Sequence, residues 1–317
     1  MIMRYLYRGE EDEFIPDEAT HITVAEDVTF VRARAFRYHP NIIELICHDK
    51  VEKIEEAAFS YCPSLKRIAL PGVKVVECAA FSGCKALTDV ECDKLEIIKV
   101  AAFSDCYSLR SINLPSARIV ESYAFRMCEV LTEVKFGSNL QRVDEGAFKK
   151  CTSLERLTLP LKDDIFTWSD NIFSECHNLV HVDPIEGEIH QIIAALQLEE
   201  WRNHMNEEIV LINQILPNAD AGSSRYIGEK TYEISMWISE VLAHLDYYKA
   251  EHLKLMKEAT TLLELALWKA NLSGNEGEIE GVRMTRGRHK RARKEICVTS
   301  GGDIVIKNVL PFLALKL

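Results

Sequence analysis

The stretch that decides the fold is Cys106-Tyr-Ser-Leu-Arg-Ser-Ile-Asn-Leu-Pro115, which is followed by the pair Ala124-Phe125. The same apolar positions return along the chain at nearly constant intervals. Successive phenylalanines are separated by 23, 22, 22, 22, 23 and 25 residues and form the column Phe36, Phe59, Phe81, Phe103, Phe125, Phe148 and Phe173. Self-similarity at a fixed period of about 20–50 residues is typical of solenoids, in which coils of chain stack on one another.

Other positions repeat in register with the phenylalanines. A leucine or isoleucine stands six residues after each Phe, and an aliphatic residue stands nine after it. One coil cannot bury its own apolar edge, so equal positions must stack on the coils before and after it. We therefore expect short parallel strands such as 65–70, several of them ending at a proline, and a second row of short extended segments before each Phe. Three residues after each Phe, the sequence has His39, Cys62, Cys84, Cys106, Cys128, Cys151 and Cys176.

This cysteine column has three interpretations. Stacked strands lie about 4.8 Å apart, and parallel side chains keep roughly that spacing, which exceeds the ~3.8 Å between the Cβ atoms of a disulfide. A free Cys also behaves as a small buried hydrophobic residue. We therefore predict reduced core thiols, with His39 as their substitute in the first coil; disulfides between coils and metal binding are the alternatives. The chain has no C-x-x-C pair, and a row along a wall does not gather the four ligands of a structural metal site.

The pattern resembles the BspA-like leucine-rich-repeat family, whose repeat reads roughly C-x-x-L-x-x-I-x-L-P followed by I-x-x-x-A-F. The segment 106–115 with Ala124-Phe125 fits this repeat fully, and the resemblance covers about residues 21–184. Departures are Cys92 and Phe136 at strand-final leucine positions, and the long interval before Phe173, which contains Trp168. The resemblance implies protein binding or adhesion rather than catalysis, and bacterial members are often surface proteins.

After Pro184 the repeat gives way to a helical period. Residues 186–216 and about 229–272 carry apolar residues at three-to-four spacing, and the residues from Pro217 to Gly228 form a loop-like stretch. The simplest arrangement is an antiparallel hairpin that covers the apolar end of the last coil. Alternatively, the longer helix pairs with a second copy of the chain. Segments 201–209 and 257–268 also resemble the C-terminal part of BspA-type proteins of diatoms, which implies an algal-type member.

The sequence thus predicts an α/β solenoid, in which the short parallel strands of a leucine-rich-repeat stack are followed by a C-terminal helical hairpin. We divide the chain into an N-terminal segment (1–20), the solenoid (21–184), a helical module (185–272) and a tail (273–317). The tail begins as a flexible polar linker and ends in the apolar stretch 302–313, which we expect to return to the body as a strand. Between them lies a basic segment with Arg283, Arg286, Arg288, Lys290, Arg291, Arg293 and Lys294.

Basic runs of this length act as nuclear-import signals or nucleic-acid contacts, and the alternative is a solvated run that neutralises the acidic body. No aromatic residue interleaves the basic ones, which disfavours stacking on single strands. The whole chain has 38 Lys+Arg against 49 Asp+Glu, a formal charge of −11, and this argues against nucleic acid as its main partner.

The N-terminus and the hydropathy bear on the compartment. The chain is acidic from Glu10 to Glu13, so we expect no signal peptide. No apolar run reaches the ~20 residues of a membrane span. We therefore expect an intracellular protein, in the cytoplasm or the nucleus, with no membrane attachment.

Common catalytic motifs are missing from the sequence: it has no P-loop, no Gly-rich dinucleotide fingerprint, no H-E-x-x-H and no G-x-S-x-G. We therefore predict no catalytic residue, no cofactor and no metal, and a function as a protein-binding scaffold. The alternatives are a nucleus-directed or chromatin-associated factor that uses residues 283–294, and a cell-surface adhesion protein of the BspA type. We expect a protein partner to meet the outward side chains of the strands, which are Lys66, Arg67, Asp89, Glu91, Arg110, Asn113, Glu133, Lys135, Glu155 and Arg156.

Overall fold

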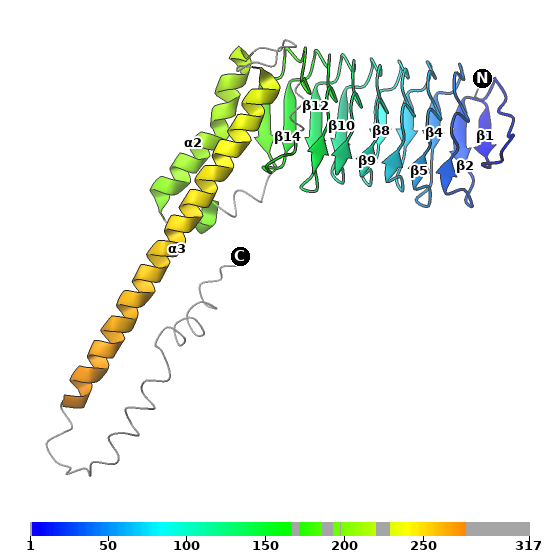
Figure 1. Ribbon diagram of the computed structural model, residues 1–317. Coiled ribbons are helices and arrows are strands. Elements are labelled where there is room, and N and C mark those ends of the chain that lie inside the picture. Colours follow the sequence, from blue (N-terminus) through cyan, green and yellow to red (C-terminus); the bar gives the residue numbers. More distant parts are fainter. Residues whose placement is uncertain (1, 167–170, 186–192, 197, 220–228, 277–317) are drawn as a thin grey trace. The chain divides into compact units, whose positions relative to one another are not determined.

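The computed structural model describes residues 2–166, 171–185, 193–196, 198–219 and 229–276, with side chains described as far as residue 269. Strands of successive coils lie side by side in chain order (Figure 1). The chain divides into two units, of which the first comprises residues 1–190 and 203–243 and the second residues 191–202 and 244–317. The predicted tail strand at 302–313 and the basic segment lie outside the described residues.

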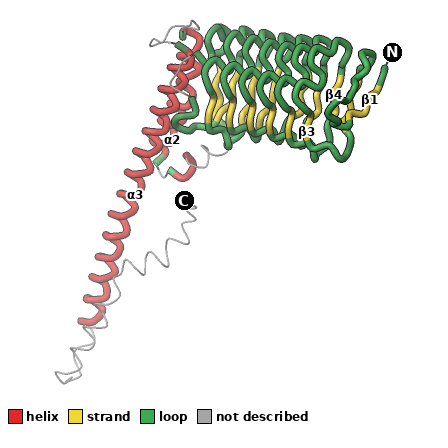
Figure 2. The backbone as a smooth tube through the Cα atoms, turned by 45° about the vertical axis from the view of Figure 1, so that its right-hand side comes forward, coloured by secondary structure: helices red, strands yellow, loops and turns green. Residues whose placement is uncertain are grey.

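One wall of the coils consists of two parallel sheets, and Figure 2 shows the strands stacked along the coils in yellow. The first sheet begins within the predicted N-terminal segment (1–20). Its edge strand, residues 4–7, pairs in parallel with residues 21–24. Its members are β1 (Arg4–Tyr7), β2 (His21–Val24), β4 (Glu44–Ile46), β6 (Arg67–Ala69) and β8 (Asp89–Glu91). The second sheet contains β10 (Ser111–Leu114), β12 (Glu133–Phe136), β14 (Arg156–Leu159) and β15 (His181–Pro184).

The second row of extended segments that the sequence predicts forms a third parallel sheet. Its strands have two residues each, and the second residue of each pair is buried. In chain order they are β3 (Phe30–Val31), β5 (Lys53–Ile54), β7 (Val75–Val76), β9 (Ile97–Ile98), β11 (Ile119–Val120) and β13 (Arg142–Val143). The solenoid class predicted from the period is therefore confirmed.

The phenylalanine column forms one continuous stack of buried rings. Neighbouring ring centroids from Phe36 to Phe173 lie between 4.6 and 5.8 Å apart, with the ring planes within 13° of parallel. Those distances are within the range that stacked aromatic pairs prefer. The departure at Phe136 is accommodated, because its ring packs edge-on against Phe148 at 6.1 Å. Trp168 lies outside the described residues.

The turn that carries each Phe repeats in backbone detail. The residues two before and two after every Phe have positive φ, as at Ala101 (55°) and Asp105 (61°) around Phe103. These two left-handed residues turn the chain on both sides of the ring. The Phe amide then donates to the carbonyl of the residue before the Phe in the next coil, as from Phe103 to Ala124 at 2.8 Å. The repeat is therefore held by backbone hydrogen bonds between the Phe turns as well as by the sheets.

The cysteine column is reduced and buried, as predicted. Each thiol donates to the carbonyl of the Phe in the preceding coil, for example from Cys106 Sγ to Phe81 O, and the six distances lie between 3.0 and 3.3 Å. Burial raises the pKa of Cys62 and Cys176 to about 12, so these donors stay protonated. In the first coil His39 takes this role, with its Nε2 3.0 Å from Pro16 O.

Two helices follow the solenoid, and each has residues in both units. They are α2 (Glu199–Ile215), which continues into the short 3-10 helix η1 (Leu216–Asn218), and α3 (Lys230–Glu276). They pack together, and the indole of Trp237 in α3 donates to the carbonyl of Glu208 in α2 at 2.9 Å. The predicted helical hairpin is thus confirmed.

The last coil is capped by side chains from these helices. Phe173 N donates to Thr231 Oγ1 at 3.3 Å, in place of the carbonyl that a further coil would offer. Asn213 Oδ1 accepts from the amide of Val182 in β15 at 2.8 Å. Lys230 is buried, and its Nζ donates to two carbonyls, one of them Leu179 O at 2.6 Å. The helices therefore satisfy the open backbone groups of the solenoid end, as an open edge requires.

We expect the Phe stack to dominate stability. Phe103 is fully buried between two rings, so Phe103→Ala should lower the free energy of unfolding by roughly 3–5 kcal/mol in urea denaturation. Tyr61→Ala is the matched control, because Tyr61 is 48% exposed and should cost well under half as much. Equal losses for the two variants would contradict a role for the stack.

The buried thiols predict an alkaline limit to stability. Burial raises the pKa of Cys47, Cys62, Cys92 and Cys176 to about 12 and shifts Cys84, Cys106 and Cys151 in the same direction. A raised folded pKa stabilises the fold below the unfolded pKa of about 9, and this stabilisation is lost as the pH rises toward 12. Each thiol should steepen that loss by at most about 1.4 kcal/mol per pH unit.

Urea denaturation between pH 8 and 11 under reducing conditions would measure this slope. In the double variant Cys106→Ser with Cys151→Ser, the hydroxyls keep a donor but do not titrate, so the slope should be shallower by up to about 3 kcal/mol per pH unit. A slope equal to that of the parent would show that these thiols do not set the alkaline limit.

Candidate protein-binding surface

The outward side chains of β1, β2, β4, β6, β8, β10, β12, β14 and β15, together with the residue just before each strand, form one surface, here called the strand face. Along each strand, core residues alternate with outward ones, as the period of two requires. The structure brings all ten predicted site residues onto this surface. Nine of them are exposed and Glu133 is half-buried.

Several charges on the strand face neutralise one another. Arg67 pairs with Asp89 on the next strand at 3.1 Å, which raises the pKa of the guanidinium. Lys135 pairs with Glu133 at 3.1 Å within β12, and Arg156 pairs with Asp183 on the neighbouring β15. Exposed pairs of this kind add little stability, so their main effect is a surface without a dominant sign.

The other predicted residues are free for a partner. Lys66, Glu91, Arg110, Asn113 and Glu155 have no side-chain hydrogen bond or ion pair among the residues that the structure describes. Their heads are solvated in the free protein and can exchange water for a ligand at low cost. The even distribution of both signs favours a polar protein surface as the ligand.

The strand face is interrupted once, between β8 and β10, which belong to different sheets. In the coils before this point, the amide that follows a strand donates to the last carbonyl of the next strand, as Leu70 N does to Glu91 O at 2.8 Å. At the interruption the thiol of Cys92 instead faces Asn113 O at 3.6 Å. Val90 is correspondingly only half-buried, unlike the other aliphatic residues of its column. The unusual Cys92 therefore coincides with a local opening of the strand array.

An apolar patch at the N-terminal end of the strand face is missing from the predicted set. Leu6, Thr23, Ile46 and Ala69 are aligned on adjacent strands, and Leu6 and Ile46 are 49% and 42% exposed. The signal was present in the sequence. The position ten residues after Phe is polar in later coils, from Glu91 onward, but holds isoleucine and alanine in the first two.

A groove runs beside this patch, across the residues that enter the five strands of the first sheet. Ile43 lies in it, 36% exposed, next to Lys66 of the predicted set. Its other lining residues are Ile2, Met3, Glu18, Thr20, Asn41, Pro63, Ser64 and Ala86. Half of the lining residues are apolar and half are polar, and protein-binding sites combine both kinds of side chain.

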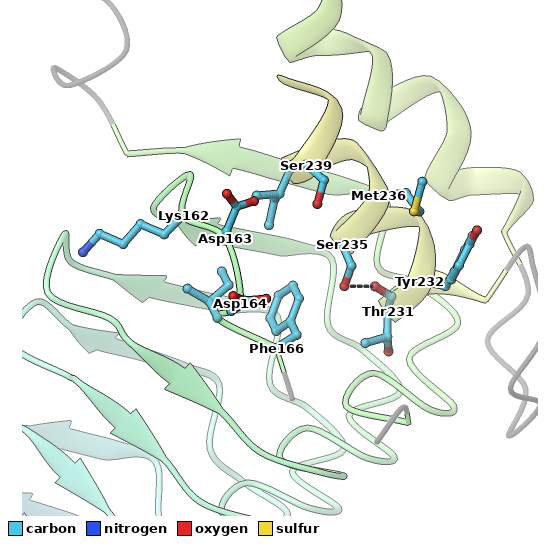
Figure 3. Close-up of a pocket in the computed structure, with 11 residues that line it drawn as sticks. Lys162, Asp163, Asp164, Phe166, Thr231, Tyr232, Ser235, Met236 and Ser239 are labelled. Carbon is cyan, nitrogen blue, oxygen red and sulfur yellow. Dashed lines mark hydrogen bonds between the residues drawn. The ribbon is translucent and has the colours of Figure 1, made fainter. Parts of the chain in front are cut away.

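A second cavity, of about 130 Å³, lies between residues 162–166 and the first turns of α3 (Figure 3). The ring of Phe166 and the side chains of Thr231 and Ser235 face one another across it. The Ser235 hydroxyl donates to the Thr231 carbonyl at 2.9 Å, as the dashed line marks. Thr231 itself caps Phe173, so this cavity belongs to the joint between the solenoid and its helical cap.

The described part of the chain has few side-chain groups arranged to bind a metal or to act as a nucleophile. It contains no group of three or more His, Cys, Asp or Glu side chains that could hold a metal ion. A cysteine nucleophile needs a lowered pKa and access to solvent, whereas burial raises the pKa of most thiols of the column. Among the described helices, none is both long and apolar enough to span a bilayer.

Comparison with protein families assigns the repeats. The model described as "BspA type Leucine rich repeat region (6 copies)" matches residues 10–119 and 96–194, which is more than half of the chain. The chain belongs to the BspA-type leucine-rich-repeat family. Members of this family are typically non-catalytic. No match was found among curated proteins.

Several solved structures are similar to this BspA-type chain. The leucine-rich-repeat protein of T. pallidum is 22% identical, with a TM-score of 0.44 over 62% of this chain and 85% of its own. A leucine-rich-repeat protein from Bacteroides ovatus is 21% identical, with a TM-score of 0.34 over 53% and 61%. The pneumococcal vaccine antigen PcpA is 20% identical, with a TM-score of 0.40 over 56% and 54%. The chain thus spans less than two thirds of the length of the last two.

Proposed function

We propose that this BspA-type chain is a non-enzymatic protein-binding scaffold and that its partner binds the strand face. The observation that carries the proposal is the apolar patch of Leu6 and Ile46 beside the groove at Ile43, continued by a row of mixed charges along the later strands. Protein-binding sites combine apolar anchors with a polar rim in this way. The parallel strands keep the side chains at fixed spacing, which limits the entropy lost on binding.

A protein fits this surface better than nucleic acid does. Nucleic-acid binding depends on a clustered positive field, whereas Arg67 and Arg156 are each neutralised by a carboxylate on the next strand. The alternative of a nucleus-directed or chromatin-associated factor depends on residues 283–294, which lie outside the described residues. Comparing salt-titrated DNA binding of the full chain with that of a chain lacking this segment would test that alternative directly.

We also propose an intracellular location, cytoplasmic or nuclear, and the state of the thiols supports it. The nine cysteines among the described residues are free, and six of them donate a thiol hydrogen bond to a Phe carbonyl within the core. The bacterial-type adhesion alternative requires export to an oxidising compartment, where disulfides persist. Mass measurement of the purified native protein without reductant, after alkylation, would reveal disulfides if that alternative holds. The algal-type lineage and the domain boundaries at 20, 184 and 272 remain proposals from the sequence.

Replacing the apolar patch should abolish partner capture. In the double variant Ile43→Lys with Ile46→Lys, two half-exposed side chains become charged, one in the groove and one in the patch, so the partner would have to bury unpaired charges. Quantitative affinity capture from the native host should show a loss of tenfold or more, at an unchanged melting temperature. Val100→Lys is the matched control, because Val100 is 40% exposed but follows β9 of the third sheet and lies outside the strand face and the groove. A loss of capture in the control as well would argue against this patch.

Charge reversal should identify the polar part of the site. Arg110→Glu combined with Arg156→Glu should weaken capture about tenfold, because charges that match a partner become repulsive. The melting temperature should hardly change, since Arg110 has no ion pair in the described structure and Arg156 has only an exposed one. Lys74→Glu, on the opposite wall, serves as the control. Undiminished capture by the double variant would exclude this half of the strand face.

A further inference from the structure

The apolar row of α3 continues far beyond the part of the helix that is buried. In its first turns Ile234, Ile238, Val241 and Leu245 are at most 2% exposed. They are separated by alternating steps of four and three residues, and the same alternation continues without a break through the rest of the helix. The later members are the apolar or aromatic residues Tyr248, Leu255, Ala259, Leu262 and Ala266, with one polar residue, His252, among them. An unbroken alternation of three and four is the seam of a coiled coil.

The helix that covers the beginning of this seam is too short to cover the rest. α2 has 17 residues and α3 has 47, which corresponds to about 25 Å and about 70 Å. In the second unit the ring of Trp201 still packs on Tyr248 at 5.1 Å. Beyond that point the apolar side chains of α3 are exposed. They are Leu253, Leu255, Leu262, Leu263, Leu265, Leu267 and Trp268.

So many exposed apolar side chains in one helix indicate an interface. Single exposed leucines are normal, but a contiguous apolar patch on a folded protein usually marks a binding site. A helix that stands alone in water is also only marginally stable, and most helices gain their stability from packing of an apolar face. The second half of α3 has both features, and the seam residues Leu255 and Leu262 are 43% and 67% exposed.

The composition of this segment fits a second copy of itself. Residues 246–269 contain four lysines and four acidic residues, so two copies would meet without net repulsion. Along the seam, large and small residues alternate, as Leu255, Ala259, Leu262 and Ala266. In an antiparallel pair a leucine of one helix can face an alanine of the other, which fills the space between the helices evenly. The seam is also continuous with the α2–α3 packing, so it needs no change of helix geometry.

We propose that two copies of the chain associate through this part of α3, as an antiparallel pair of helices. One register matches every alanine of the seam with a leucine. It sets Leu255 opposite Ala266 of the second copy, and Ala259 opposite Leu262. The proposed pairing uses no residue of the strand face.

The test is the mass of the full chain in solution, measured by light scattering and sedimentation from micromolar to submillimolar concentration. We expect the parent to reach twice the chain mass of 36.1 kDa. Leu255→Glu with Leu262→Glu should be monomeric at every concentration, with unchanged melting of the solenoid. A monomeric parent would overturn the proposal and indicate that this face binds another kind of partner. A double variant that still dimerises would also overturn the proposal.

A matched control separates the seam from general stickiness. Leu253→Glu with Leu267→Glu changes two residues that are 72% and 53% exposed but lie about 130° around the helix from the middle of the seam. This variant should remain dimeric. If it dissociates as completely as the seam variant, the seam is not the interface.

Cross-linking tests the direction of the two helices. In the proposed register, Leu255→Cys mixed with Ala266→Cys should give a disulfide-linked heterodimer under mild oxidation, above the level seen with the parent chain. Ala266→Cys alone should not cross-link, because in an antiparallel pair its counterpart is displaced by 11 positions, or about 16 Å. Efficient cross-linking of Ala266→Cys with itself would overturn the antiparallel arrangement.

Discussion

Each coil relies on its neighbours to bury its phenylalanine, and most other features of the solenoid follow from that dependence. Ring centroids about 5.3 Å apart in the middle of the stack match the spacing of about 4.8 Å between hydrogen-bonded strands. The side-chain stack and the backbone ladders therefore advance at nearly the same pitch. An inserted residue can be tolerated only where neither is disturbed, and the long interval before Phe173 is absorbed between β14 and that ring.

The thiols fit the same constraint. A Phe carbonyl already accepts the amide three residues later in its own coil, as Phe81 O does from Cys84, and its second lone pair points toward the next coil. Cys106 Sγ supplies a donor there without adding bulk. A cysteine is small, apolar enough for the core and able to donate weakly. Packing and hydrogen bonding therefore explain the cysteine column. Its thiols are buried donors, whereas the thiols of redox sites are accessible and have a low pKa.

The sequence was sufficient to predict the features that follow from the repeat. It was not sufficient to predict the contacts at the ends of the solenoid or at positions that depart from the repeat. The Phe and Cys columns, the two strand rows and the hairpin were predictable because each is local or periodic. The cap was predictable as a requirement, but not the use of Thr231, Asn213 and Lys230, because these contacts join residues 31 to 58 positions apart. Burial lowers the pKa of Lys230, and two carbonyl acceptors compensate its charge. No sequence pattern predicts these contacts.

The candidate site shows the same division. The ten charged and polar residues were expected to point outward, and nine of them are exposed. Seven lie within strands, where alternation directs them away from the core, and Lys66, Arg110 and Glu155 stand just before a strand. The apolar patch at Leu6 and Ile46 does not belong to the predicted site, which consists of polar outward residues only. An apolar residue at an outward position has a different effect in a solenoid than in an unrelated loop. Any outward residue repeats at the strand spacing, so two apolar choices in neighbouring coils form a continuous patch, whereas in unrelated loops they would remain isolated. The second half of α3 follows the same logic, since a seam that continues past its cover becomes a surface.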